Sequence, residues 1–352
     1  MTKLKKLQLW RFVESVGFSR IVVAAALVLL FIMTISLPVR LDASISDTLI
    51  QFGMNGVMVL ALLPMIRSGC GLNFALPLGI IAGLLGAVTS VEISVTGLPG
   101  IILAMLIATP IAIILGCGHA FLLNRVKGKE MITSIYVGFA SVAFMRIMWL
   151  VLPYKSQDMI WGYAGQGLRT IISIHKYWHN AIGGIGSLQI GDFFFFPTGM
   201  FLFFAMLCIC MWLFLRSKTG TTMTAVGSNP EFAKANGINI NKMRTISVIL
   251  STWLGAIGII IYQQGLGFIQ LYMGPFYMAF PAAAAILIGG ASIGKASIAN
   301  VVIGTILFQS ILTMTPSVIS SLLDTDISEV LPTILSSSII LYALTRAAKA
   351  KS

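Results

Sequence analysis

Residues Thr245–Gly294 read TISVILSTWLGAIGIIIYQQGLGFIQLYMGPFYMAFPAAAAILIGGASIG, a run of 50 residues without a charged side chain. A helix needs about 20 consecutive apolar residues to cross a lipid bilayer. The stretch is therefore long enough for two membrane-spanning helices, with a Gly-rich turn between Gly265 and Gly274.

The composition of the whole chain points the same way. Of its 352 residues, 57% are hydrophobic and 10% are charged, whereas a soluble domain carries about 25% charged residues. Soluble enzymes, disordered tails and disulfide scaffolds are thereby excluded. The net charge of +12 would suggest nucleic acid in a soluble protein, but in a membrane protein it orients the chain, and no nucleic-acid partner is expected. The composition predicts an all-α integral membrane protein.

Uncharged stretches between charged residues predict about ten transmembrane helices, because a charge in hydrocarbon is costly. They form a single transmembrane domain over residues 1–352, with an inner loop at 216–244 and an outer loop at 153–196. The predicted spans are approximately 21–38, 48–66, 71–90, 99–123, 131–152, 197–215, 245–264, 275–290, 297–315 and 330–345.

The distribution of charge tests this count. With the N-terminus inside, 18 of the 23 Lys and Arg residues fall on the inner side, four fall outside, and Arg146 lies within a span. Eight of the 11 acidic residues fall outside. Because inner loops of membrane proteins carry an excess of Lys and Arg, this sorting favours ten spans with cytoplasmic N- and C-termini. No A-x-A cleavage site follows the first span, so we interpret it as an uncleaved anchor.

Metal binding is not expected. His175 and His179 in the outer loop are four residues apart and could pair on a helix, but no third ligand is nearby. A segment with Trp161 and Trp178 lying on the membrane surface is the favoured interpretation. The cysteines show no C-x-x-C spacing and are interpreted as reduced packing residues; they are Cys70, Cys117, Cys208 and Cys210.

The order of the spans suggests an inverted repeat. Spans 2–5 and 7–10 run in opposite directions, and many transporters are built from such halves with interrupted helices at matching places. The third and eighth spans are the most interrupted, with Pro77, Gly79, Gly83 and Gly86 in one and Pro275, Pro281, Gly289 and Gly290 in the other. Helix packing through small residues would give the same pattern.

No catalytic constellation is visible. The string G-G-A-S-I-G-K-A, residues Gly289–Ala296, resembles a nucleotide-binding loop, but Ala296 replaces the hydroxyl that would hold magnesium. This chain should therefore not bind ATP, and no cofactor is expected.

The polar residues within the spans are neutral amides, which suit an uncharged, hydroxyl-rich solute. Bridging between helices is an equally open role for each of them. Arg146 lies about 15 residues, roughly 22 Å, into the fifth span. There we favour snorkelling or pairing with an outer acid over substrate contact. The candidates for the translocation path are Asn55, Asn73, Gln263 and Gln309.

The inner loop contains S-N-P-E-F-A-K-A-N-G-I-N-I, residues Ser228–Ile240. Asn229 is a good N-cap, with Pro230 at the first helical position. Ser228 and Glu231 offer an alternative capping box, and Gly237 supplies a left-handed stop. The pattern predicts an isolated helix of about seven residues, which is marginal alone in water and must dock on a partner.

Here the sequence resembles the permease subunits of bacterial ABC importers of the ribose, nucleoside and branched-chain amino acid type. The run Gly289–Gly294 is also similar to that family. So is Gly69–Gly86, although Asn73 stands where sugar permeases usually carry an acid. The inner loop carries the family's G-x-N-P-E-A-A-like segment as Gly227, Asn229, Pro230, Glu231, Ala233, Gly237, Ile238 and Asn239.

The resemblance implies a ten-helix permease in the bacterial cytoplasmic membrane that pairs with a second permease subunit. Two cytoplasmic ATPase subunits would supply the ATP hydrolysis, and an external binding protein would deliver the solute, with sugar or nucleoside favoured over amino acid. An ion-coupled secondary transporter is the alternative. Docking on the ATPase is expected through Phe232 and Ala233 in particular. By match to the motif, the coupling residues are Asn229, Pro230, Glu231, Phe232, Ala233, Lys234 and Gly237.

Overall fold

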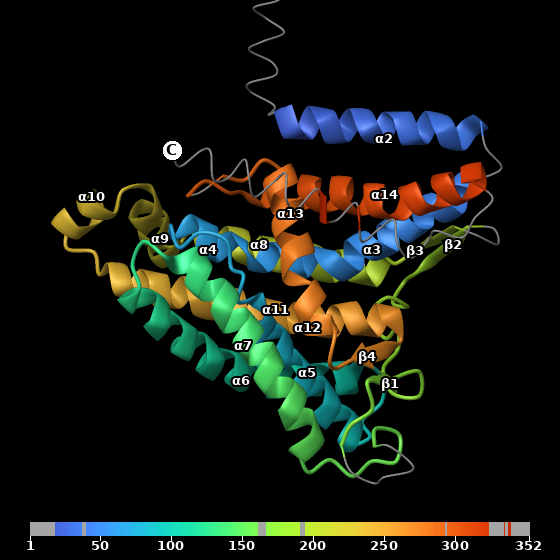
Figure 1. The fold of residues 1–352 in the computed structure, drawn as a ribbon, viewed down its shortest axis with the longest axis horizontal. Helices are drawn as coiled ribbons and strands as arrows, with labels where there is room; N and C mark the ends of the chain where they lie inside the picture. The colour runs from blue at the N-terminus through green and yellow to red at the C-terminus, as the bar shows by residue number, and fades with distance from the viewer. Residues whose placement is uncertain are drawn as a thin grey trace, which may run out of the picture.

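The computed structural model is built almost entirely of helices (Figure 1). It describes residues 18–36, 40–160, 167–190, 194–292 and 294–323, together with residues 334, 337 and 338. The helices are α2 (Phe18–Ser36), α3 (Leu41–Ala61), α4 (Leu63–Arg67), α5 (Leu76–Glu92), α6 (Gly97–Arg125), α7 (Glu130–Val151), α8 (Thr198–Arg216), α9 (Lys218–Ser228), α10 (Pro230–Ala235), α11 (Ile240–Leu266), α12 (Gly274–Tyr277), α13 (Ala279–Ile288) and α14 (Ile298–Leu323).

The described residues are mostly helical, which is consistent with the prediction of an all-α membrane protein. Among the described residues, six helical stretches are long and apolar enough to cross a membrane: Leu41–Arg67, Gly97–Arg125, Glu130–Val151, Thr198–Arg216, Ile240–Leu266 and Ile298–Ile319. Three shorter apolar helices are Ala24–Thr34, Leu76–Glu92 and Ala279–Ile288. Each of the first nine predicted spans falls on one of these helices. The tenth, 330–345, lies outside the described residues but for 334, 337 and 338.

The centre of the fold is α11, which packs against α3, α5 and α6. Glycines of α5 allow the closest of these contacts. A Cβ on Gly79 would lie 2.3 Å from the carbonyl oxygen of Thr252, and one on Gly83 would lie 2.4 Å from that of Ala256. Small residues let membrane helices approach backbone to backbone, so these glycines fix α5 against α11.

Two of the predicted spans, the third and the eighth, are not continuous helices from end to end. The third span was predicted from residue 71, but α5 begins at Leu76, and Gly69 and Gly71 in the preceding segment have φ of 76° and 83°. The eighth span is split between the single turn α12 and α13. A left-handed φ at two nearby glycines interrupts a helix, so the apolar run is longer than the helix.

The outer segments form short β-ribbons, which the prediction of helices alone missed. Strand β1 (Ile171–Ser173) pairs antiparallel with β4 (Phe268–Gln270), and β2 (Leu188–Ile190) pairs antiparallel with β3 (Phe194–Phe196). The β1–β4 ribbon ties the outer loop to the end of α11.

The part of the outer loop around Trp178 is packed into the protein, which corrects the prediction that this tryptophan lies on the membrane surface. Trp178 is 1% exposed, whereas Trp161 lies outside the described residues. His175 and His179 lie in consecutive turns with ring centroids 4.2 Å apart. Burial lowers the pKa of His179, and the neighbouring His175 lowers it further. No cluster of three metal-ligating side chains exists among the described residues.

Candidate functional site

Helix α10 has the caps that the sequence predicts. The side-chain oxygen of Asn229 accepts a hydrogen bond from the backbone N–H of Phe232 at 3.0 Å. Pro230 opens the helix, and Gly237 follows it with φ of 75°. The alternative capping box is not formed, because the Ser228 hydroxyl donates to the Thr224 carbonyl instead. The local sequence alone therefore defines both ends of this short helix.

Helix α9, directly before α10, was missed by the sequence analysis. Its N-cap is Ser217, whose hydroxyl oxygen accepts from the N–H of Gly220 at 3.2 Å. Its buried face carries Gly220, Met223 and Val226, and α10 packs against α9. The short helix is therefore not isolated, and part of its order comes from this chain. The Ser217 cap and the apolar face at three-residue spacing were the available signals.

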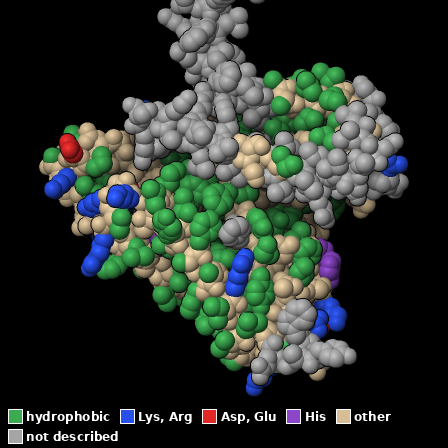
Figure 2. Space-filling view, in the orientation of Figure 1, with side chains coloured by type: hydrophobic (Ala, Val, Ile, Leu, Met, Phe, Trp, Pro, Cys, Tyr) green, Lys and Arg blue, Asp and Glu red, His purple; other side chains and the backbone are tan. Residues whose placement is uncertain are grey.

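The two residues expected to contact a partner differ in exposure. Ala233 is fully buried within this chain, so its predicted contact with an ATPase is wrong. Phe232 is 62% exposed, and Glu231 and Lys234 on the same helix are also exposed. Figures 1 and 2 show α10 projecting at one end of the molecule, where charged side chains gather. The one large apolar side chain that α10 offers to a partner is Phe232.

Close approaches between glycines bring the end of α9 against two loops from other parts of the chain. The glycines are Gly69, Gly227 and Gly294. A Cβ on Gly227 would lie 2.1 Å from the carbonyl oxygen of Arg67 and 2.8 Å from the amide nitrogen of Gly69. A Cβ on Gly294 would lie 3.2 Å from the carbonyl oxygen of Gly227. The end of α9 therefore contacts both the segment before α5 and the loop after α13.

One face of α11 holds the segment that precedes α5. Arg244 Nε donates to Cys70 Sγ at 3.2 Å, and Ser247 Oγ donates to Ser68 Oγ at 2.7 Å. One turn further, Ser251 Oγ accepts from Asn73 Nδ2 at 2.8 Å. Arg244 also forms an ion pair with Glu130 at the start of α7. The spacing of three and four residues places the three α11 side chains on one face, which keeps the segment in place.

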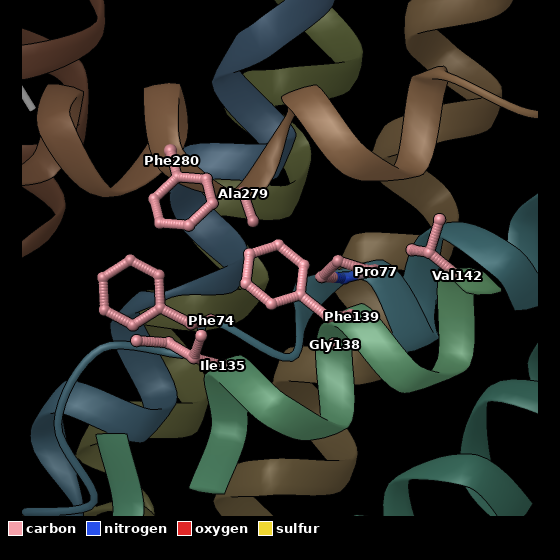
Figure 3. Close-up of a pocket in the computed structure, with 8 residues that line it drawn as sticks. All are labelled: Phe74, Pro77, Ile135, Gly138, Phe139, Val142, Ala279 and Phe280. Atoms are coloured by element: carbon pink, nitrogen blue, oxygen red, sulfur yellow. The ribbon is translucent and has the colours of Figure 1, made fainter. Parts of the chain in front are cut away.

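The four amides proposed for the translocation path lie on four different elements. Asn55 donates to the backbone and side chain of Gln51, while Asn73 is fully buried on Ser251. Gln263 is 1% exposed, and neither its nitrogen nor its oxygen has a partner among the described residues. Gln309 is 5% exposed. Asn73 thus has the bridging role that the sequence left open, and none of the four lines the pocket shown in Figure 3.

That pocket was missed by the sequence analysis, because its residues are distant in the chain. Figure 3 shows the rings of Phe74, Phe139 and Phe280 turned toward one another. They come from residues 68–75 before α5, here called the α5 entry segment, from α7 and from α13. The centroids of Phe74 and Phe280 are 5.3 Å apart, and those of Phe139 and Phe280 are 6.3 Å apart. The lining is Phe74, Pro77, Ile135, Gly138, Phe139, Val142, Ala279 and Phe280.

Arg146 does not pair with an acid in the described part of the chain. Its Nε donates to the carbonyl oxygen of Tyr272 at 3.4 Å, and its Nη2 lies 3.6 Å from Met273 Sδ. The side chain is exposed. The guanidinium therefore crosses toward the segment that leads into α12, and the predicted pairing with an outer acid is wrong for the acids that the structure describes.

The loop Gly289–Ala296, which resembles a nucleotide-binding motif, does not follow a strand as that motif does. It follows the helix α13, and the carbonyl oxygen of Gly289 accepts from Asn300 Nδ2 at 2.6 Å. A Cβ on Gly289 would lie 1.9 Å from the carbonyl oxygen of Asn300. Gly289 thus serves the close contact between α13 and α14.

Comparison with known proteins identifies the family. The model of the family described as branched-chain amino acid transport system / permease component matches residues 44–344 of the 352-residue chain. The chain belongs to this family, as the resemblance predicted. It is the permease component of an ABC importer, a multi-pass membrane protein and a transport subunit that is not an enzyme. No match was found among curated proteins. Membership argues against the alternative of an ion-coupled secondary transporter.

Proposed function

We propose that this chain forms the translocation path of an ATP-driven importer as one of two permease subunits. An external binding protein delivers a small polar solute, with a sugar or nucleoside favoured, and ATP is bound and hydrolysed by cytoplasmic partner subunits. The topology is ten spans with both termini in the cytoplasm of a bacterial cell.

The observation that carries the proposal is the exposure of Phe232 on a capped helix. Helix α10 is ordered by Asn229 and by packing on α9, yet it leaves a large aromatic side chain 62% exposed. Aromatic side chains dominate the energetics of protein interfaces. Because the family match makes this chain the permease component, the partner for this surface is the ATPase.

The geometry of α5 and α13 supports the inverted repeat. The two helices have 17 and 10 residues. Each follows an irregular segment: residues 68–75 before α5, and residues 271–278, with the turn α12, before α13. Each has a proline near its start, Pro77 and Pro281. Discontinuous helices at matching places in two halves are typical of transporters with inverted repeats.

The test is co-purification of the ATPase with a Phe232→Ala variant. Truncation of an aromatic anchor at an interface costs about 2 kcal/mol or more, which is roughly a thirtyfold loss of affinity. The control is Ile185→Ala, which removes an exposed apolar side chain, 46% exposed, from the outer loop. We expect loss of ATPase from the first variant only. Full ATPase retention by Phe232→Ala would refute the docking role of α10.

A further inference from the structure

A positive charge lies on an apolar surface of α7. Arg146 is 16 residues after Glu130, which is about 24 Å along a helix of about 33 Å. Further outward on the same helix, Leu150 and Val151 are apolar and 55% and 68% exposed. Figure 2 shows mainly hydrophobic side chains on the middle of the face where α7, α12 and α13 lie. An ionised residue at this depth ordinarily faces water or a polar partner and marks a solute pathway.

Arg146 lies on the edge of α7 that borders α12 and α13. Ile135, Phe139, Val142 and Arg146 follow one another at spacings of four, three and four residues, which places them on one face of a helix. The first three line the pocket, and the guanidinium reaches Tyr272 just before α12. This edge therefore has a polar outer end and an apolar, aromatic middle.

The pocket lies where the two discontinuous helices begin. Phe74 and Pro77 belong to the start of α5, and Ala279 and Phe280 belong to the start of α13. Phe139 is nine residues into α7, which is about 14 Å from its inner end and close to the middle of the membrane. In transporters with inverted repeats, solute sites lie near the midplane at the starts of such half-helices. Helix N-termini also favour anionic and hydrogen-bond-accepting groups.

We infer that solute moves along the edge of α7 that faces α12 and α13, between Arg146 at its outer end and the ring cluster Phe74, Phe139 and Phe280. This inference rests on the proposed function as a permease. Because Nε donates to the carbonyl oxygen of Tyr272, Arg146 can offer a solute only the N–H donors of Nη1 and Nη2, and no acceptor. The solute therefore has an anionic or hydrogen-bond-accepting end that meets Arg146 and an apolar or planar face that packs on the phenyl rings. Cationic solutes are excluded.

Cysteine labelling tests whether this edge is in water. The chain is assembled with its partners in membrane vesicles, and its four natural cysteines are changed to alanine. Phe139→Cys then places a thiol on the proposed path, and Phe144→Cys is the matched control on the same helix. Both phenylalanines are exposed, 41% and 61%, but Phe144 lies about 160° around the helix from Arg146. The cysteine thiolate, which forms in water and not in apolar surroundings, attacks a methanethiosulfonate, forms a mixed disulfide and displaces methanesulfinate.

The charge of the reagent tests the role of Arg146. Arg146 is seven residues from Phe139, or about 10 Å along the helix. At that distance in water, one unit charge speeds an anionic reagent and slows a cationic one by about twofold each, a fourfold change in their ratio. The sulfonatoethyl reagent should therefore lose about fourfold against the trimethylammonioethyl reagent when Arg146→Gln is added. High salt should reduce the difference.

The labelling results either support or overturn the inferred path. Labelling of Phe139→Cys without labelling of Phe144→Cys supports the path, and Ile135→Cys against Ile147→Cys repeats the comparison if either variant fails to insert. No labelling at either path position means that lipid or a second permease subunit covers this edge, which overturns the inference. Equal labelling at both faces overturns it as well. If Arg146→Gln leaves the ratio of the two labelling rates unchanged, the inferred class of solute is wrong. ATPase co-purification does not depend on these results, so the proposed function can fail separately.

Discussion

Replacing Gly227 with alanine should displace the docking arm formed by α9 and α10. Gly227 lies in the last turn of α9, where its Cα faces the backbone that leads into the α5 entry segment. An added Cβ would lie 2.1 Å from the carbonyl oxygen of Arg67 and 2.8 Å from the amide nitrogen of Gly69. Both contacts are with backbone atoms, so no side-chain rotation can relieve them.

The size of the effect follows from two opposing terms. Carbon atoms pack at about 3.5–4.0 Å, so the backbone must move by more than about 1 Å. Overpacking of this kind costs about 1–3 kcal/mol. Alanine in a helix is favoured over glycine by at most about 1 kcal/mol. The net change for Gly227→Ala is therefore a loss of about 0–2.5 kcal/mol in the free energy of unfolding.

Gly118→Ala is the matched control. Gly118 lies in α6, and a Cβ there would meet no atom within 4 Å. Only the helix-propensity gain of about 0.5–1 kcal/mol remains. The two variants should therefore shift the unfolding midpoint of the detergent-solubilised protein in opposite directions. Because α9 carries α10, Gly227→Ala should also reduce co-purification of the ATPase, and Gly118→Ala should not.

The unfolding midpoint of Gly227→Ala and the amount of ATPase that co-purifies with it together test whether this contact exists. If Gly227→Ala is as stable as the wild type and retains the full amount of ATPase, the close contact between α9 and the α5 entry segment does not exist in the assembled protein. If Gly227→Ala loses stability but retains the full amount of ATPase, the contact of Gly227 stabilises the fold without affecting how α10 docks on the ATPase. The proposed link between the docking arm and the membrane helices would then be wrong.

Three further predictions concern single positions. Gln263→Met should leave stability unchanged or raise it by about 1–3 kcal/mol, since it removes a buried amide without partners among the described residues; a lower unfolding midpoint contradicts this. Reporter fusions after Lys176 should be external and those after Lys234 internal, and a shared side would refute the topology. The isolated chain should not hydrolyse ATP, because Ala296 replaces the magnesium-binding hydroxyl. Lys295→Ala should accordingly change the ATPase rate of the assembled importer by no more than a few-fold.

The sequence predicts where the apolar helices lie because charge and apolar length are local properties. Each of the first nine predicted spans falls on an apolar helix, and the caps of α10 depend on Asn229 and Gly237 alone. The predictions fail where distant residues decide the structure. The α5 entry segment is held by Arg244, Ser247 and Ser251 of α11, and no pattern within residues 68–75 shows those partners.

The error at Ala233 has a simple physical cause. A helix of six residues makes fewer than two turns, so its sequence cannot show which side is buried. The packing of α10 against α9 decides which side is buried. The aromatic pocket was missed for a related reason, because Phe74, Phe139 and Phe280 come together only after three segments pack. The sequence predicts that Arg146 lies within a span, but only the fold places it beside Tyr272, in the segment that leads into α12.

The contacts of Gly227 give the docking arm two short routes to the aromatic pocket. The first begins at Gly69, which touches Gly227, and ends five residues later at Phe74 in the pocket. The second begins at Gly294 and runs back through α13 to Phe280. Helix α13 has 10 residues and so acts as a rod of about 15 Å. Packed interiors transmit displacement because they contain few voids. A movement of α9 that keeps both glycine contacts would therefore displace the two segments that lead to opposite sides of the pocket.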